Sequence, residues 1–171
     1  MKKNAEKSLY SKEKGKWKMR VDYELMTAQA VGFLETEPGY VPFLSNLSAL
    51  IYQTLPDLNW AGFYTVTEDG GLLLGPFQGK VACIRLGKGK GVCGAALAQN
   101  EVMLVPDVHA FPGHIACDSA SNSEIVLPMH DAKGRQRAVL DIDSPLLGRF
   151  TEEDAAGLAA LVAAVETKIV W

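Results

Sequence analysis

Apolar residues recur at helical spacing in two segments that precede any strand pattern, residues 22–35 and 41–54. Pro38 and Gly39 end the first segment and Pro56 closes the second, because proline cannot continue a helix and glycine is common just past a helix end. Both stripes are typical of helices that pack one face against a core. The pattern therefore predicts two helices in the first third of the chain.

The middle of the chain changes to the shorter periodicity of strands. Residues 60–66 alternate aromatic and β-branched side chains, and a turn at 68–71 leads into residues 72–74, which predicts a hairpin. A Gly/Pro break at 75–79 then separates the hairpin from a third predicted strand at 81–86.

The remaining elements continue this order. The Gly-Lys-Gly-Lys-Gly run at 87–91 lacks the spacing of a phosphate-binding loop and predicts a turn before a short helix at 92–99. Two strands are predicted at 125–130 and 137–142, and Thr151 is the predicted N-cap of a last helix with an acidic first turn. Helices at both ends of a run of mostly hairpin-connected strands indicate an α+β domain with a central antiparallel sheet.

One long stretch fits neither periodicity. Residues 105–124 are polar and are interrupted by Pro106, Pro112 and Gly113, yet they contain Cys117 and two of the three histidines. A connection of this length without regular structure is uncommon in a compact domain, and is usually functional or disordered. Because the stretch also contains apolar residues that can pack, we interpret it as a folded active-site loop.

Length and composition fit one globular domain. The 171 residues are 48% hydrophobic, and no stretch approaches the ~20 apolar residues of a membrane span. Three cysteines are an odd number in a chain large enough to fold without disulfides, and the N-terminus lacks the apolar core of a secretory signal. We therefore expect a reducing compartment, the cytoplasm, and no membrane partner.

The net charge of −3 is unevenly distributed. Residues 1–20 contain eight basic and two acidic residues, so this segment carries +6 and the rest carries −9. The chain is therefore divided into a basic N-terminal extension at 1–20, expected to be flexible, and a folded domain at 21–171. A basic arm is compatible with nucleic acid or an anionic membrane, but only Trp17 and Tyr10 are available to stack on bases. No nucleic-acid partner is predicted.

The three cysteines do not form the C-x₂₋₄-C pair of a zinc site, so no metal is predicted. The less favoured alternative is that Cys117, His114 and the other two thiols converge on a metal. Cys83 lies in an apolar strand pattern and fits a buried thiol, whereas Cys117 lies in a polar loop and does not. Cys93 lies at the start of the helix predicted at 92–99, where the helix dipole is expected to stabilise its thiolate.

Five segments together resemble the free methionine-(R)-sulfoxide reductases, which are single-domain enzymes of the GAF fold. The likeness runs from about Tyr23 to the C-terminus, so residues 21–171 are expected to form a GAF domain. The stretch around Cys117 is the most specific part, whereas the GAF fold alone indicates little about activity. The five segments are NWAGFY (59–64), GPFQGK (75–80), GKGVCG (89–94), PDVHAFPGHIACDSASNSEIV (106–126) and LDIDSPLLGRFTEED (140–154).

The resemblance implies a thiol-dependent reduction of free L-methionine-(R)-sulfoxide. Cys117 is then the attacking residue, Cys83 the main resolving residue, and Cys93 either a second resolving thiol or a relay. Attack on sulfur gives methionine and a cysteine sulfenic acid, which a second thiol converts into a disulfide. No bound cofactor is implied. Thioredoxin, with NADPH and thioredoxin reductase, is the expected external reductant, and the resemblance suggests a homodimer.

Three acids, Glu124, Asp141 and Asp143, correspond to the cluster that polarises the sulfoxide. Independently of the resemblance, Asp141 and Asp143 stand two positions apart in a predicted strand and so point to one face. Crowded carboxylates raise one another's pKa, so one of them can remain protonated near neutral pH. The alternative is that Asp141 and Asp143 cap the turn that begins near Ser144.

The resemblance also implies residues that hold the substrate. Trp60 and Tyr64, an even number of positions apart on a strand, are the expected wall around the S-methyl group, although core residues would show the same pattern. Backbone amides around Ile115 and Ala116 are the expected partners of the substrate carboxylate, and the acidic cluster is the expected partner of the ammonium group.

The alternative from a different functional class is a non-catalytic GAF domain that senses a small molecule or a redox state. Such sensors usually occur together with a kinase, cyclase or DNA-binding output domain, and this sequence contains none. A small domain with three cysteines at the positions of the resemblance favours the enzyme over the sensor.

Overall fold

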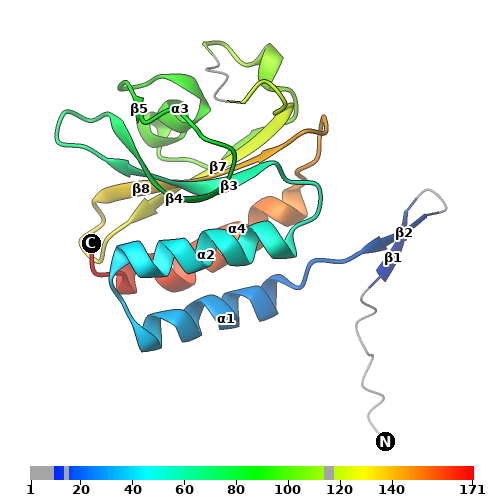
Figure 1. The fold of residues 1–171 in the computed structure, drawn as a ribbon, viewed down its shortest axis with the longest axis horizontal. Helices are drawn as coiled ribbons and strands as arrows, with labels where there is room; N and C mark the ends of the chain where they lie inside the picture. Colours follow the sequence, from blue (N-terminus) through cyan, green and yellow to red (C-terminus); the bar gives the residue numbers. More distant parts are fainter. Residues whose placement is uncertain (1–9, 14–15, 114–117) are drawn as a thin grey trace, which may run out of the picture.

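The structure is a computed structural model that describes residues 10–13, 16–113 and 118–171. Within these residues, the main body contains one antiparallel sheet of six strands in the order β5-β4-β3-β8-β7-β6. Helices pack against it (Figure 1), which confirms the predicted α+β class. The strands are β3 (Trp60–Val66), β4 (Leu72–Gly79), β5 (Arg85–Leu86), β6 (Met103–Val105), β7 (Ser123–His130) and β8 (Gln136–Ser144).

The two faces of the sheet are covered differently. Helices α1 (Tyr23–Thr36), α2 (Tyr40–Thr54) and α4 (Glu152–Val165) lie on one face, where they enclose the larger apolar core (Figure 1). Helix α3 (Gly91–Gln99) and the long connections lie on the other face, over a second, smaller apolar cluster. The 3₁₀ turns η1 (Val108–Ala110) and η2 (Glu166–Lys168) complete the elements of the main body.

The helix boundaries follow the local signals in the sequence. Asp22 caps α1, because its side chain accepts a hydrogen bond from the backbone N–H of Leu25 at 2.9 Å. The predicted cap of the last helix is also present: Thr151 and Asp154 form a reciprocal capping box at the start of α4. These caps satisfy backbone donors that have no partner within the helix.

Strand β4 is longer than predicted, because it continues through Gly75 and Pro76 to Gly79. On one side it pairs with β3, with a register shift between Gly62 and Tyr64, and on the other it meets β5 only at Leu72 and Leu73. Proline is tolerated on such a free edge, where no ladder needs its missing N–H. The break predicted at 75–79 was therefore wrong.

The strand predicted at 81–86 is reduced to Arg85–Leu86. Val81 and Ile84 are 89% and 72% exposed, so the apolar pattern that suggested a strand belongs to a surface loop. Cys83 lies in this loop and is half-buried, so it is not the core thiol that its strand pattern indicated. Strand β6 was missed because its three residues are too few to show a period.

Residues of the predicted basic extension form a two-stranded ladder, β1 (Tyr10–Glu13) with β2 (Lys16–Met19). Figure 1 shows this hairpin standing apart from the main body. The flexibility of the extension stays a prediction. None of the helices in the described part of the chain combines the length and hydrophobicity that a bilayer crossing requires.

Candidate active site

Three carboxyl groups lie together on the α3 side of the sheet. Glu124 of β7 is paired directly with Asp143 of β8, and Asp141 stands two residues along β8. Side chains two apart on a strand share a face, so all three are directed to one side of the sheet. Glu124 is 6% and Asp141 7% exposed.

The environment of these acids favours their neutral forms. Burial raises the pKa of Glu124 and of Asp143 well above the usual range, and the nearby charge of Asp141 adds to both shifts. Burial likewise raises the pKa of Asp141 to about 6. Among the described residues, no lysine, arginine or histidine forms an ion pair with any of the three. The site can therefore hold a proton on a carboxyl group near neutral pH.

Cys93 closes one side of the acidic cluster. It is the third residue of α3 and is 4% exposed, with its Sγ 3.9 Å from Oε1 of Glu124. Burial, followed by the charges of Asp141 and Glu124, raises the pKa of the Cys93 thiol far above its usual value. The predicted stabilisation of its thiolate by the helix dipole is therefore wrong, because desolvation and two carboxylates outweigh the helix terminus.

A pocket lies over the cluster. Its lining includes the three carboxyl groups together with Tyr64, Cys93 and Asp118. A second, smaller pocket shares Tyr64 and Asp118 with the first and is also lined by Trp60.

Two aromatic residues form one wall. Trp60 pairs with Asp143 across β3 and β8, and stacks on Tyr64 with 5.9 Å between ring centroids. Trp60 donates a hydrogen bond to the carbonyl of Lys80 at 3.2 Å, and the Tyr64 hydroxyl donates to the carbonyl of Cys83 at 3.0 Å. The predicted aromatic wall therefore also anchors the loop that contains Cys83.

Asp118 is a pocket residue that sequence reasoning did not single out. Its carboxylate accepts hydrogen bonds from the backbone N–H of Ala120 at 2.9 Å and from the Asn59 amide at 3.1 Å, and lies 3.5 Å from the Lys80 ammonium. These contacts lower the pKa of Asp118, in the order Ala120, Asn59 and Lys80, so this acid is ionised while its three neighbours resist ionisation. Its position directly after Cys117 in the sequence was the available signal.

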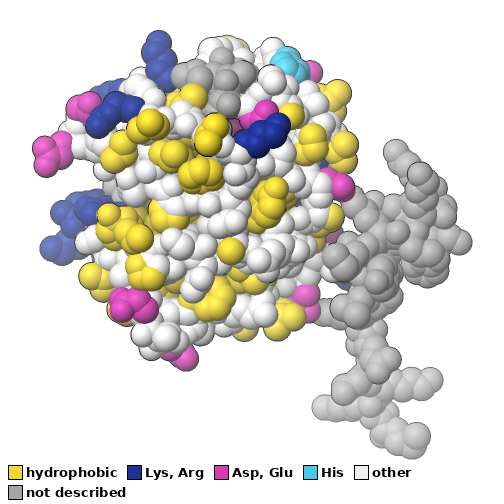
Figure 2. Space-filling model, in the orientation of Figure 1, with side chains coloured by type: hydrophobic (Ala, Val, Ile, Leu, Met, Phe, Trp, Pro, Cys, Tyr) yellow, Lys and Arg dark blue, Asp and Glu magenta, His cyan; other side chains and the backbone are white. Residues whose placement is uncertain are grey.

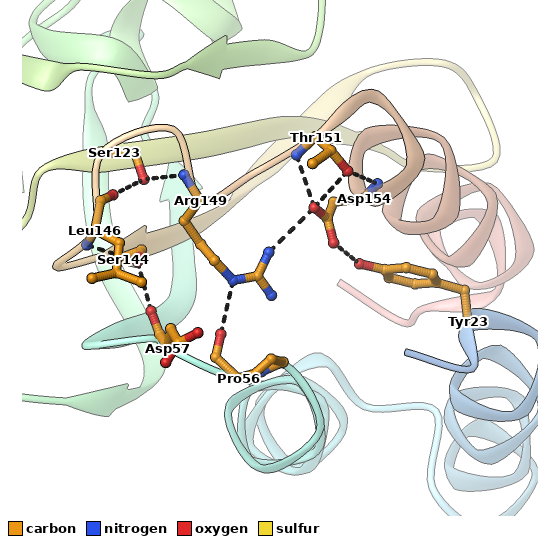
Figure 3. Close-up of polar contacts among 9 residues, drawn as sticks. All are labelled: Tyr23, Pro56, Asp57, Ser123, Ser144, Leu146, Arg149, Thr151 and Asp154. Atoms are coloured by element: carbon orange, nitrogen blue, oxygen red, sulfur yellow. Dashed lines mark hydrogen bonds and ion pairs between the residues drawn. The ribbon is translucent and has the colours of Figure 1, made fainter. Parts of the chain in front are cut away.

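Two serines next to the acids fix the end of the sheet (Figure 3). Ser123 donates to the carbonyl of Leu146 at 2.6 Å, and Ser144 donates to the carbonyl of Asp57 at 2.6 Å. Ser144 Oγ also accepts from the Leu146 N–H at 3.1 Å. The turn is thus capped by Ser144, whereas Asp141 and Asp143 line the pocket, which disfavours the turn-capping alternative for these two acids.

Beyond this turn, Arg149 links the connection between β8 and α4 to the helices. Its guanidinium donates to the carbonyl of Pro56 at 2.9 Å and pairs with Asp154 at 3.2 Å, and Asp154 also accepts from the Tyr23 hydroxyl at 2.6 Å (Figure 3). Burial and the Asp154 carboxylate raise the pKa of Tyr23 above its usual range, so its hydroxyl stays a donor. These contacts fasten the connection that follows β8 to the end of α2 and to α4 and α1.

The sequence of this domain has close relatives. A GAF-domain family profile matches residues 44–169. The chain is 54% identical, over 145 residues, to the free methionine-R-sulfoxide reductase of Escherichia coli. The matched segment covers 85% of this chain and 82% of that protein. The chain belongs to the free methionine-R-sulfoxide reductase family of GAF-domain proteins. This confirms the resemblance and places the chain among enzymes.

Solved structures of the reductase family share the fold. The structure of fRMsr of Staphylococcus aureus in its reduced form matches with a TM-score of 0.83 at 42% identity, and the match covers 88% of this chain and 97% of that one. The X-ray structure of the free methionine-R-sulfoxide reductase of Neisseria meningitidis in complex with its substrate has a TM-score of 0.81 at 40% identity, and covers 85% and 87%.

The structure brings most of the predicted reductase residues together. Glu124, Asp141, Asp143 and Cys93 line one pocket, and Asp118 lines it as well. Three predicted residues, Cys117, Ile115 and Ala116, lie outside the described residues, as does His114. Cys83 occupies the neighbouring loop, so its carbonyl meets the aromatic wall of the site.

Proposed function

We propose that the protein reduces free L-methionine-(R)-sulfoxide to methionine. The observation that supports this most directly is the buried group formed by Glu124, Asp141 and Asp143, whose pKa values are all raised. Reduction of a sulfoxide needs a proton at the departing oxygen, and a carboxyl group that is neutral near pH 7 can supply it. The identity to the reductase of Escherichia coli supports the same reaction.

The proposed reaction uses two thiols in succession, first Cys117 and then Cys83. The thiolate of Cys117 attacks the sulfoxide sulfur while the oxygen takes a proton. The protonated oxygen then passes to the cysteine sulfur as the bonds from the substrate sulfur to the oxygen and to the cysteine break, which releases methionine and leaves a sulfenic acid on Cys117. The Cys83 thiol then displaces water from the sulfenic acid to form a disulfide. Thioredoxin, kept reduced by NADPH and thioredoxin reductase, returns the disulfide to two thiols. Support for the position of the attack is that Asp118, the residue after Cys117, lines the pocket.

The charge of the pocket supports a free amino acid as substrate. Asp141 is ionised above about pH 6, and no basic side chain of the described residues pairs with it. An ammonium group would supply the missing positive charge. A methionine residue inside a peptide has no ammonium group to offer, so the pocket favours the free amino acid. Backbone amides around Ile115 and Ala116 are the proposed partners of the substrate carboxylate, and Trp60 and Tyr64 the proposed partners of the S-methyl group.

The decisive experiment is turnover of the two separated epimers of free methionine sulfoxide, measured by NADPH oxidation with thioredoxin and thioredoxin reductase. We expect turnover of the R epimer and little of the S epimer. No turnover of the R epimer with a competent dithiol donor would favour the sensor alternative. The cytoplasm as the compartment and a homodimer as the assembly are part of the proposal, and sedimentation of the purified chain tests the second.

A further inference from the structure

In the pocket, one thiol and two carboxyl groups bring possible metal-ligand atoms close together. One atom each from Cys93, Glu124 and Asp141 (a sulfur and two carboxylate oxygens) lie within 4.8 Å of one another. All three residues are buried, at 4%, 6% and 7% exposure. They come from α3, β7 and β8, so the sheet and the helix packed on it hold the group in place.

The spacing is close to that of a coordination shell. Bond lengths of about 2.3 Å to sulfur and 2.1 Å to oxygen put tetrahedral ligands of zinc about 3.6 Å apart. The Sγ of Cys93 lies 3.9 Å from Oε1 of Glu124, so side-chain shifts of a few tenths of an ångström are enough to bring the pair to that distance.

A second observation is that one ligand-type oxygen of the group has no hydrogen-bond donor among the described residues. Oδ1 of Asp141 is buried and, within the described residues, accepts no hydrogen bond. Asp141 also lines the pocket beside the other two residues. A buried carboxylate oxygen without a donor is costly and rare, and a cation would satisfy it.

We propose that Cys93, Glu124 and Asp141 form a binding site for a thiophilic divalent cation such as Zn²⁺. A thiolate with two carboxylates suits zinc, whereas Mg²⁺ and Ca²⁺ prefer oxygen ligands alone. On binding, the Cys93 thiol and the Glu124 carboxyl group release their protons to solvent, the sulfur and the two carboxylates bond to the ion, and water takes the remaining position. The ion then occupies carboxylates that the reductase needs, so it inhibits. This last consequence rests on the proposed function.

Binding is tested directly with Co²⁺, whose bond to a thiolate gives a charge-transfer absorption. In the full-length chain carrying Cys83→Ser and Cys117→Ser, Cys93 is the only thiol, so any such band reports this site. We expect one equivalent of Co²⁺ to produce the band and Zn²⁺ to displace it, whereas Mg²⁺ does not. Adding Cys93→Ser should abolish the band. No band, or a band that persists without Cys93, would overturn the site.

The oxygen ligands are tested in the same two-serine background. Glu124→Gln and Asp141→Asn keep the side-chain shape and should each weaken Co²⁺ binding at least tenfold, whereas the matched control Asp118→Asn should weaken it less than threefold. Circular dichroism checks that each variant is folded. If both amide variants bind as tightly as the control, the carboxylates are not ligands and the proposal fails.

Inhibition is measured separately, as single-turnover reduction of the R epimer by the wild-type chain with and without Zn²⁺ at ten times its Kd. We expect the rate to fall at least fivefold and to recover on chelation, and the Cys93→Ser chain to keep a larger fraction of its own rate. An unchanged wild-type rate with Zn²⁺ bound would overturn inhibition. A wild-type chain with no turnover at all would count against the proposed function and leave the Co²⁺ result standing.

Discussion

Three acids and a thiol share a pocket that offers them no cationic side chain from the described residues, and this sets the chemistry of the site. Desolvation is the largest cause of the raised pKa at Glu124, Asp141 and Asp143. Asp118, in the same pocket, is stabilised in its charged form by hydrogen bonds and a lysine. Near neutral pH the pocket therefore contains two acids suited to donate a proton, Glu124 and Asp143, together with the ionised Asp118.

The first prediction concerns proton donation. Glu124→Gln and Asp143→Asn remove a transferable proton while keeping the shape, and general acid catalysis typically contributes 10²–10⁴-fold. We expect each change to slow single-turnover formation of methionine by roughly that range. Rapid quenching measures the rate, and thermal melting checks the fold. Asp118→Asn is the control and should slow the step much less. Near-normal rates in both Glu124→Gln and Asp143→Asn would exclude these residues as donors.

The second prediction concerns stability and pH. Asp141 has a folded-state pKa of about 6, above the usual 3.8, so the folded protein binds more protons than the unfolded chain between these values. Its stabilising contribution is complete below about pH 4 and is lost as pH rises through 6. Because one pKa unit corresponds to about 1.4 kcal/mol, the loss is on the order of 3 kcal/mol.

Denaturant unfolding of the wild type and of Asp141→Asn from pH 4 to 8 measures this loss. The wild type should lose stability relative to Asp141→Asn as pH rises. Asp131→Asn is the control. Burial raises the pKa of Asp131, but hydrogen bonds from Arg135 outweigh this effect and lower the pKa to about 2, so Asp131 titrates below this pH window. Parallel curves for the wild type and Asp141→Asn would contradict the prediction.

At the scale of elements, the site depends on how closely β3 approaches its neighbours. Gly62 lies between Phe77 of β4 and Asp141 of β8 in the sheet. A Cβ on Gly62 would overlap the Cβ of Phe77 and lie 2.7 Å from the Trp60 ring. The glycine in the NWAGFY segment therefore has a packing role, because it lets Trp60 fold over the strand toward Phe77.

The third prediction follows from this approach. Gly62→Ala should destabilise the fold by about 1–3 kcal/mol, the usual cost of overpacking a core. It should also weaken substrate binding, because the Trp60 ring must move. Gly32→Ala is the matched control: a Cβ there meets nothing within 4 Å in the middle of α1, so alanine should stabilise by up to about 1 kcal/mol. Equal melting temperatures for the two variants would contradict the assignment.

Elements with strong local signals were predictable from the sequence, and those that depend on neighbours were not. The cap at Thr151 and the alternation that places Asp141 and Asp143 on one face are local, and both are present. The segment 81–86 has an apolar pattern, but only Arg85 and Leu86 pair with a neighbouring strand, so most of the segment forms a loop. The high pKa of Cys93 was likewise unpredictable, because it depends on carboxylates from two distant strands.

At the scale of the whole molecule, the sheet separates the larger apolar core from the candidate active site. The larger core lies on the face of the sheet that α2 and α4 cover, with α1 packed on these two helices (Figure 1). The pocket, which Cys93 of α3 lines, lies on the other face. Polar contacts of Arg149 and Asp154 hold the connection between β8 and α4 (Figure 3). On the surface viewed in Figure 2, hydrophobic side chains form several small groups, interrupted by polar surface. The pocket with Cys93 therefore lies on the opposite side of the sheet from the larger core.

The proposed resolving step needs a thiol that an external dithiol can reach, and the two described thiols differ in exposure. Cys83 is half-buried in a loop between the exposed residues Val81 and Ile84, whereas Cys93 is 4% exposed beneath the pocket. The high pKa of Cys93 also leaves little thiolate to attack a sulfenic acid. Within the proposed mechanism, exposure and pKa thus favour Cys83 over Cys93 as the resolving thiol.

The last prediction separates the three thiols by counting turnovers. Cys117→Ser should abolish even the first, stoichiometric release of methionine. Cys83→Ser should keep that single equivalent, measured by rapid quench, but lose sustained NADPH oxidation with thioredoxin, because the sulfenic acid then lacks its accessible partner. Cys93→Ser should keep the first equivalent and impair recycling less than Cys83→Ser does. If Cys83→Ser abolishes the first equivalent while Cys117→Ser retains it, the attacking and resolving roles are reversed.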